Sequence, residues 1–133
     1  MRVGSSLFGC VVAATLLPSP GATAADDGAT LFRKACGTCH ALTEADGARA
    51  GPPLAGAYGR AAGTVAGFGY SPALRDAGFV WDAASLDAWI TNPAAMRPGT
   101  TMLYRQRDAA RRQLLIDYLR TLSQTAAASS PAE

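Results

Sequence analysis

The residues most able to do chemistry lie in one pentapeptide, Cys36-Gly37-Thr38-Cys39-His40, and His40 is the only histidine of the chain. Two cysteines three residues apart lie on one face of a helical turn, where their thiols can form thioethers with the two vinyl groups of a haem. The adjacent imidazole would then bind the iron as its proximal ligand. Because there is no second histidine, the opposite face of the iron needs a different ligand or stays open.

Three other interpretations of the pentapeptide are weaker. A zinc site usually needs four ligands, but the only other cysteine is Cys10 and no second ligand pair follows. A thioredoxin-like dithiol lies beside alternating strands and helices, a pattern that the sequence lacks. A structural disulfide between Cys36 and Cys39 would not require His40. The sequence therefore predicts one covalently bound haem c, attached through Cys36 and Cys39, with His40 as an iron ligand.

The N-terminal segment has the pattern of a secretory signal peptide. Arg2 precedes an apolar run over residues 7–17, and a group of small residues follows. This pattern predicts a signal peptide over residues 1–25, cleaved near Ala24 or Ala25. An uncleaved anchor is the alternative, although the run is shorter than the roughly 20 residues that a membrane span needs. Because thioethers to haem are formed outside the cytoplasm, where cysteines would otherwise oxidise, we expect a periplasmic protein with no stable membrane insertion.

The rest of the chain predicts a single all-α domain over residues 26–123, with a flexible tail over residues 124–133. Residues 41–69 are rich in Gly, Ala and Pro and are expected to form a loop. A loop of this length is unusual in a small domain, and a large prosthetic group would give it something to wrap. Four helices are expected, each after a possible capping residue. The first covers about residues 28–36 after Asp27, and a short one begins at Pro72 after Ser71 and stops by Gly78. The third follows Asp82 and ends at Asn92-Pro93, and the fourth follows Asp108 and ends near Ser123.

Two methionines follow the signal segment and could supply a sulfur ligand, Met96 and Met102. A methionine thioether suits a low-spin, electron-transfer haem; the alternative is that both side chains fill gaps in the core, their commoner role. The local sequence favours Met102, because the segment after Pro98-Gly99 can thread a side chain inward. Met96, in contrast, lies beside the helix-terminating Pro93.

The chain resembles the class I cytochromes c, close to the mitochondrial protein and its bacterial periplasmic relatives. The resemblance runs from about Gly28 to Leu122 and consists of separate blocks in the family's order and spacing. These blocks are residues 32–40, 51–56 and 67–71, Trp81, Asn92-Pro93, residues 98–102 and Tyr118-Leu119. The resemblance implies a small domain whose helices and long loops wrap one covalent haem, with Met102 as the axial methionine.

Further roles are implied by the same resemblance. The haem propionates, which need donors when buried, would be held by Arg60, Tyr70, Trp81 and Thr100. The alternatives are a surface position for Arg60 and ordinary core packing for the two aromatic residues. Pro52 matches a proline whose preceding segment accepts the proton of the proximal imidazole, through a backbone carbonyl that would fix the tautomer of His40. The crossing of the terminal helices would be made by Gly28, Phe32, Leu115 and Tyr118.

The chain also departs from the family pattern. Trp89 stands where a tyrosine is usual beside the axial sulfur, so no hydroxyl would reach Met102 from that side, and Leu74 replaces a frequent asparagine. Both changes are expected to make the pocket more apolar. Met96 replaces a frequent tyrosine and is an alternative ligand. The ring of lysines used for docking by the mitochondrial protein is largely missing, since Lys34 is the only lysine.

These observations predict a soluble periplasmic one-electron carrier, with a single His/Met-ligated haem cycling between Fe(III) and Fe(II), and not an enzyme. No spare histidine or paired carboxylates offer acid–base chemistry. The rival function is a haem peroxidase or a gas-binding sensor, which needs an open or labile sixth position.

The expected partners are redox proteins: a membrane oxidase, a respiratory or photosynthetic complex, or a periplasmic dehydrogenase. The formal charge of +2 includes Arg2, so the exported chain carries about +1 and gives no reason to expect nucleic acid. Arg33 with Lys34, and Arg105 with Arg107, could steer an acidic partner; the alternative is a solvated surface. The protein is expected to be a monomer.

Overall fold

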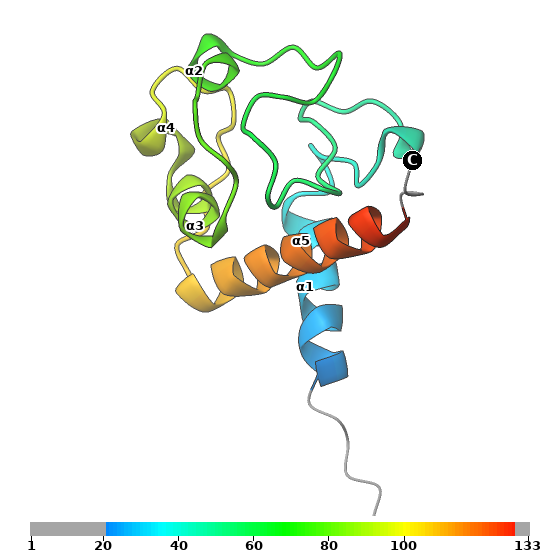
Figure 1. Cartoon of the computed structure of the whole chain (residues 1–133). Coiled ribbons are helices and arrows are strands. Elements are labelled where there is room, and N and C mark those ends of the chain that lie inside the picture. Colours follow the sequence, from blue (N-terminus) through cyan, green and yellow to red (C-terminus); the bar gives the residue numbers. More distant parts are fainter. Residues whose placement is uncertain (1–20, 130–133) are drawn as a thin grey trace, which may run out of the picture.

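Two long helices cross at the base of the molecule (Figure 1). The computed structural model describes residues 21–129, with side chains from residue 27 onward. The crossing helices are α1 (Gly21–Ala35) and α5 (Ala109–Ser129), and the elements between them are η1 (Glu44–Asp46), α2 (Pro72–Arg75), α3 (Ala83–Thr91) and α4 (Pro93–Met96). Within the described residues no strand forms, and the pairing of Ala61 with Val80 is an isolated bridge. The predicted all-α class is confirmed.

The crossing of α1 and α5 depends on a small residue at the point of contact. A Cβ atom added to Gly28 would lie 2.9 Å from the carbonyl oxygen of Leu114 and 3.0 Å from Cβ of Tyr118. Any larger residue would push the two backbones apart. Phe32 packs beside this contact, with its ring centroid 5.6 Å from that of Tyr118. The expected role of Gly28 is therefore confirmed.

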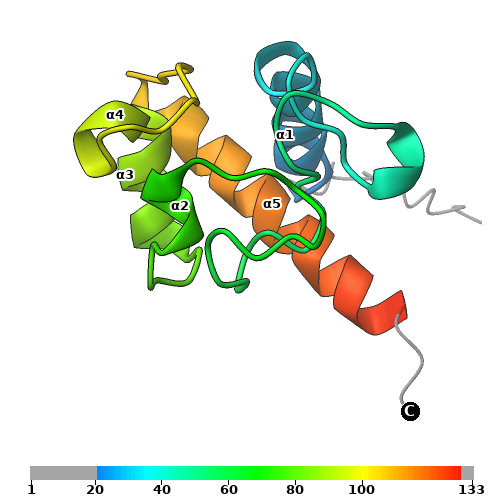
Figure 2. The same cartoon turned by 90° about the horizontal axis from the view of Figure 1, so that it is seen from above.

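Helix α3 lies beside α5 and completes the core (Figure 2). It begins as expected, because the Asp82 carboxylate accepts from the N–H of Ser85 at 2.7 Å and the Ser85 hydroxyl accepts from the Asp82 N–H at 2.8 Å. It ends at Asn92, whose side chain then caps the unexpected short helix α4 through the N–H of Ala95. The buried core consists of Phe32, Leu86, Trp89, Ile90, Leu115, Ile116 and Leu119.

The limits of both terminal helices differ from the sequence prediction. Helix α1 begins at Gly21, so Asp27 lies inside it and does not cap it. Helix α5 runs past Ser123 to Ser129, because three consecutive alanines favour helix and no proline occurs before Pro131. The end expected near Ser123 was therefore too early.

Most of the predicted signal peptide, residues 1–20, lies outside the described part of the chain, as do residues 130–133 of the predicted tail. The boundaries of signal, domain and tail thus stay predictions. Among the described helices, none is both long and apolar enough to cross a membrane.

The long loop is held by backbone hydrogen bonds to two other segments. Residues 51–55 pair with residues 39–42, through Gly51 N to Cys39 O at 2.7 Å and Ala55 N to Leu42 O at 2.8 Å. Residues 59–62 pair with residues 79–81. These pairings bring His40 close to residues 51–52 and bring Arg60 beside Trp81, although each pair is separated in the sequence.

Candidate functional site

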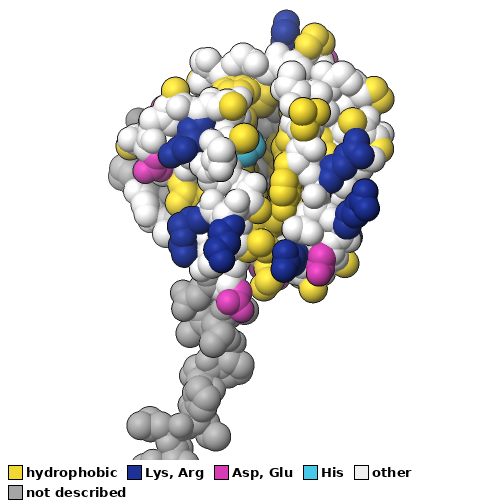
Figure 3. All heavy atoms as spheres, turned by 180° about the vertical axis from the view of Figure 1, so that it is seen from behind, with side chains coloured by type: hydrophobic (Ala, Val, Ile, Leu, Met, Phe, Trp, Pro, Cys, Tyr) yellow, Lys and Arg dark blue, Asp and Glu magenta, His cyan; other side chains and the backbone are white. Residues whose placement is uncertain are grey.

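An apolar cleft opens on the face shown in Figure 3, with the histidine on one wall and basic side chains on both sides. Residues 37–56 form one side of the molecule, and α3, α4 and residues 97–108 form the other, in both ribbon views. Several apolar side chains that contact the core stay partly exposed, among them Leu54, Leu74, Trp81, Met96, Met102 and Tyr104. Apolar surface left open in this way is expected to be covered by a ligand or partner.

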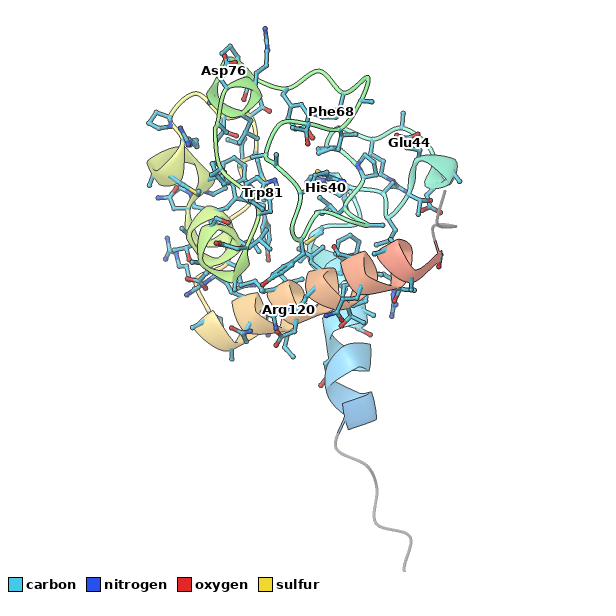
Figure 4. The ribbon with its side chains drawn as sticks, in the orientation of Figure 1. His40, Glu44, Phe68, Asp76, Trp81 and Arg120 are labelled. Carbon is cyan, nitrogen blue, oxygen red and sulfur yellow. The ribbon has the colours of Figure 1, made fainter. Side chains whose placement is uncertain are left out.

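His40 is held in one tautomer and one orientation. Its Nδ1–H donates to the carbonyl oxygen of Pro52 at 2.8 Å, which leaves the lone pair of Nε2 free to bind a metal. Burial lowers the pKa of His40, and the bond to Pro52 opposes this in part, so the imidazole is neutral around neutral pH. In Figure 4 His40 lies in the centre of the loops, with Trp81 beside α3. The expected backbone carbonyl is thus present, but it belongs to Pro52 itself and not to the segment before it.

Gly51 packs directly against the imidazole, a role that sequence reasoning missed. A Cβ atom at this position would lie against the ring, 2.8 Å from Nε2 of His40. Any side chain there would displace the ring, since real Cβ atoms do not approach other atoms so closely. The glycine before Pro52 was visible in the sequence, but nothing in the sequence indicated that its missing side chain makes room for His40.

The two cysteines lie at the end of α1 and in the following turn, which joins His40 N to Cys36 O at 2.9 Å. Both thiols are free, with Cys36 partly buried and Cys39 exposed. Burial, and next the proximity of Cys39, raise the pKa of Cys36 to about 11. A redox-active dithiol has a lowered thiol pKa instead. Among the described residues, no three His, Cys, Asp or Glu side chains gather to hold a metal ion.

Met102 lies in the extended segment after Pro98-Gly99, as the sequence suggested. Its Sδ accepts a hydrogen bond from Nε1 of Trp89 at 3.0 Å, and its backbone N–H donates to Oγ1 of Thr100 at 3.4 Å. As expected, no hydroxyl reaches this sulfur from the side of Trp89, but a polar donor, the indole N–H, takes its place. Sequence reasoning considered the loss of a hydroxyl and overlooked the indole N–H as a replacement donor. Met96 lies in α4 and is only partly buried.

The four residues assigned to the propionates are partly buried but do not bond to one another among the described contacts. The guanidinium of Arg60 donates to the carbonyls of Pro53 and Ala55 at 3.4 and 3.5 Å. These bonds are long and leave donors free. The Tyr70 hydroxyl accepts from the N–H of Val65 at 3.4 Å, and the Trp81 ring packs edge-on against Phe79 and Trp89.

Ser71 is a further candidate that sequence reasoning assigned a different role. It precedes α2 but makes no side-chain cap bond. Its hydroxyl is buried and has no hydrogen-bond partner among the described residues. A buried hydroxyl without a partner is costly, and it follows Tyr70 directly. The unpaired Ser71 hydroxyl is therefore consistent with a site that binds a polar group of a ligand.

Comparison with known proteins agrees with this geometry. The family model described as Cytochrome c matches residues 25–123. The chain belongs to the cytochrome c family. It is 47% identical over 77 residues to a cytochrome c2 of Rhodoplanes tepidamans, which covers 58% of this chain and 71% of the relative. It is 38% identical over 99 residues to the cytochrome c of Euglena viridis, covering 74% of this chain and 96% of that relative.

Membership of this family confirms the cofactor as a covalently attached haem c with iron, and the general role as electron transport between redox proteins. The residues present fit this group. His40 offers a free ring nitrogen, two free thiols precede it and the cleft is apolar, while the buried Ser71 hydroxyl has no partner among residues 21–129.

Proposed function

We propose that this cytochrome c is a periplasmic one-electron carrier, with its haem attached through Cys36 and Cys39 and its iron bound by His40 and Met102. When bound, the haem supplies one-electron transfer between Fe(III) and Fe(II). The observation that carries the proposal is the hydrogen bond from Nδ1 of His40 to the carbonyl oxygen of Pro52, which leaves Nε2 free to bind the iron.

The two ligand side chains have chemistry that suits transfer of an electron without a proton. The imidazole is already neutral and keeps its tautomer through the Pro52 carbonyl. The thioether of Met102 has no proton to gain or lose, so neither side chain changes its protonation with the oxidation state. Little rearrangement of the chain is then needed at each transfer, as a carrier requires.

The propionates would be held by Arg60, Tyr70, Trp81 and Thr100, and we add Ser71 to this set. The support is that Arg60 has donors to spare and that the Ser71 hydroxyl is buried without a partner. Replacing Ser71 by Ala should leave the apoprotein intact, because no bond is lost there. In the haem-loaded protein the same change should lower stability.

The partner would dock through the segment that follows Met102. Along this segment Met102, Tyr104 and Gln106 point inward, whereas Leu103, Arg105 and Arg107 are exposed, as the two-residue period of an extended chain requires. Leu103 is 84% exposed, and the two arginines favour an acidic partner surface. The expected partners remain a membrane oxidase, a respiratory or photosynthetic complex, or a periplasmic dehydrogenase.

The proposed organisation is a signal peptide over residues 1–25, a haem domain over residues 26–123 and a tail over residues 124–133. Sequencing the N-terminus of the protein purified from the periplasm tests the first boundary. A start near Ala25 or Asp26 supports it, and an intact Met1 contradicts it.

The decisive test of the proposed ligation combines mass and absorption. We expect the mass of one haem to persist after denaturation, and the ferric iron–thioether charge-transfer band to be lost in Met102→Ala but kept in Met96→Ala. Loss of the band in Met96→Ala alone would transfer the ligand role to Met96. Ready binding of carbon monoxide to the reduced native protein would favour the peroxidase or gas-sensor function.

A further inference from the structure

The side chain of Arg97 joins the end of α4 to a segment that lies about 20 residues earlier in the chain. Its Nη2–H donates to the carbonyl oxygen of Ala77 at 2.6 Å, and its guanidinium lies over the Phe79 ring, 5.1 Å from the ring centroid. Arg97 is partly buried, and neither ion pair of the described residues includes it. A planar guanidinium can donate to a carbonyl and stack on an aromatic face at the same time.

Arg97 also opens the tight turn that leads to Met102. Its carbonyl oxygen accepts from the N–H of Thr100 at 3.2 Å, which closes a turn whose Gly99 has a φ of 89°. Such a φ is the one that a type II turn requires at this position. The Thr100 hydroxyl then accepts from the N–H of Met102 at 3.4 Å. The placement of Arg97 is therefore passed on to Met102 through one closed turn.

The segment that Arg97 contacts is held in place by bonds of its own. The carbonyl oxygen of Phe79 accepts from the N–H of Ala62 at 2.9 Å, and the Phe79 ring packs edge-on against Trp81, with centroids 4.8 Å apart. Ala77 is buried. Residues 77–79 thus form an anchor that does not depend on Arg97.

The turn, in contrast, depends on Arg97 for its hydrogen-bonded link to this anchor. Among the described residues, no other hydrogen bond joins residues 97–101 to a segment outside α4 and the turn itself. A hydrogen bond from a charged donor is stronger than one between neutral groups. Movement of the turn that carries Met102 out of the cleft would have to break or strain this bond.

We propose that Arg97 is a positioning residue for Met102: by holding the turn on residues 77–79, it keeps Met102 on the iron and limits the fraction of protein whose sixth position is open. This inference rests on the proposed ligation by Met102. It goes beyond that ligation, because Met102 could bind the iron equally well if Arg97 were an ordinary surface charge.

The test is a titration of the ferric, haem-loaded protein with imidazole at neutral pH, followed by the loss of the iron–thioether band. Imidazole binds only when the sixth position is open, so its apparent affinity rises with the open fraction. The neutral ring replaces a neutral thioether, so loss of the arginine charge has little direct effect on this exchange. Arg97→Leu keeps an apolar side chain over Phe79 and should bind imidazole about tenfold more tightly, the effect of one hydrogen bond from a charged group.

The matched control is Arg111→Leu, which removes the same charge from an exposed position on α5 and should leave the affinity for imidazole unchanged. A role of Arg97 in packing or net charge alone gives a different result. Arg97→Leu would then match the unchanged protein or Arg111→Leu in its affinity for imidazole, even if its thermal stability fell, and this would overturn the proposal.

A second variant decides if Arg97→Leu does not fold. Phe79→Leu removes the ring beneath the guanidinium and leaves Arg97 in place. We expect it to bind imidazole about two- to fivefold more tightly, the effect of one cation–π contact. An unchanged affinity in Phe79→Leu would then overturn the proposal.

The same titration separates this inference from the proposed ligation. If the unchanged protein lacks the iron–thioether band, ligation by Met102 is wrong and the inference falls with it. If the band is present and Arg97→Leu binds imidazole as the unchanged protein does, the ligation stands and only the role of Arg97 is wrong.

Discussion

The two sides of the cleft hold His40 and Met102, the two proposed ligands, by different means. On the histidine side, residues 36–56, His40 is fixed by backbone, the carbonyl of Pro52 twelve residues along the chain and the bare backbone of Gly51. On the methionine side, α3 together with residues 97–108, Met102 is fixed by the side chain of Trp89. The two contacts span similar distances along the chain, 12 and 13 residues. The difference lies in what makes the contact, which is backbone on the histidine side and a side chain of the core on the methionine side.

The methionine side also relies on one arginine to join its parts. Arg112 of α5 forms an ion pair with Asp87 of α3 at 2.7 Å. The same guanidinium donates to the carbonyl oxygens of Gln106 and Arg107 at 3.1 and 3.0 Å. One side chain thus links two helices and the segment that follows Met102.

The largest effect is expected from Leu115→Ala, which removes packing that both sides share. Leu115 is 1% exposed in the helix on which the two sides rest, and a buried Leu→Ala change costs about 2–5 kcal/mol. Denaturant unfolding should show one transition at a lower midpoint, with the haem absorption and the far-UV signal lost together. Leu103→Ala, at an exposed leucine, is the matched control and should be nearly neutral. Separate transitions for the haem absorption and the far-UV signal would contradict the view that both sides of the cleft depend on packing against α5.

The second effect is confined to the histidine side. Gly51→Ala places a methyl group against the His40 ring, and overpacking of this kind costs about 1–3 kcal/mol. The free energy of unfolding should fall and the haem spectrum should change. Gly69→Ala is the control, because a Cβ at Gly69 meets nothing within 4 Å. Equal effects of the two substitutions would mean that His40 is not packed on Gly51.

A smaller effect is expected from Arg112→Gln on the methionine side. The Arg112 side chain is 13% exposed, but that of Asp87 is 48% exposed, so water screens part of the ion pair. We expect a loss of about 1–2 kcal/mol, mostly from the bonds to the two carbonyls. Hydrogen exchange should rise selectively in residues 102–107. Arg111→Gln, at an exposed neighbour, should leave both quantities unchanged; uniform exchange in the Arg112 variant would argue against a local tie.

The smallest effect is a loss of stability in acid, to which each side contributes one carboxylate. On the methionine side, hydrogen bonds to Ser85 lower the pKa of Asp82, which caps α3. On the histidine side, hydrogen bonds to Thr43 lower the pKa of Asp46. Because the folded pKa lies below the ordinary value of 3.8, this stability is complete above pH 4 and disappears as the pH falls through the folded pKa. Urea midpoints between pH 7 and pH 3 measure it.

The Asn amide oxygen can accept hydrogen bonds as Asp does but does not titrate in this range. Asp82→Asn and Asp46→Asn should therefore each reduce the fall in the urea midpoint at acid pH. The two variants should reduce it to a similar extent, since both carboxylates are exposed. A much larger change in one of them would show that acid unfolds that side of the cleft first.

The fold was predictable where a helix or a turn depends on its own residues. The cap at Asp82, the end of α3 before Pro93 and the loop over residues 41–69 follow from local preferences, and all occur. The helix ends at Gly21 and Ser129 were not predicted, because no strong stop signal marks them. Ser71 had a capping residue's sequence context but not its hydrogen bond, since burial of its hydroxyl is a tertiary effect.

The sequence by itself determined the attachment motif and the single imidazole, because spacing along one segment fixes which side chains can act together. It also favoured Met102 over Met96 as the proposed sulfur ligand. Only the tertiary structure decided that Gly51 lies on the imidazole, that Pro52 provides the acceptor and that the N–H of Trp89 meets the sulfur of Met102. These are contacts between side chains and backbone of different segments. They depend on how the segments pack, and no local preference of either segment specifies them.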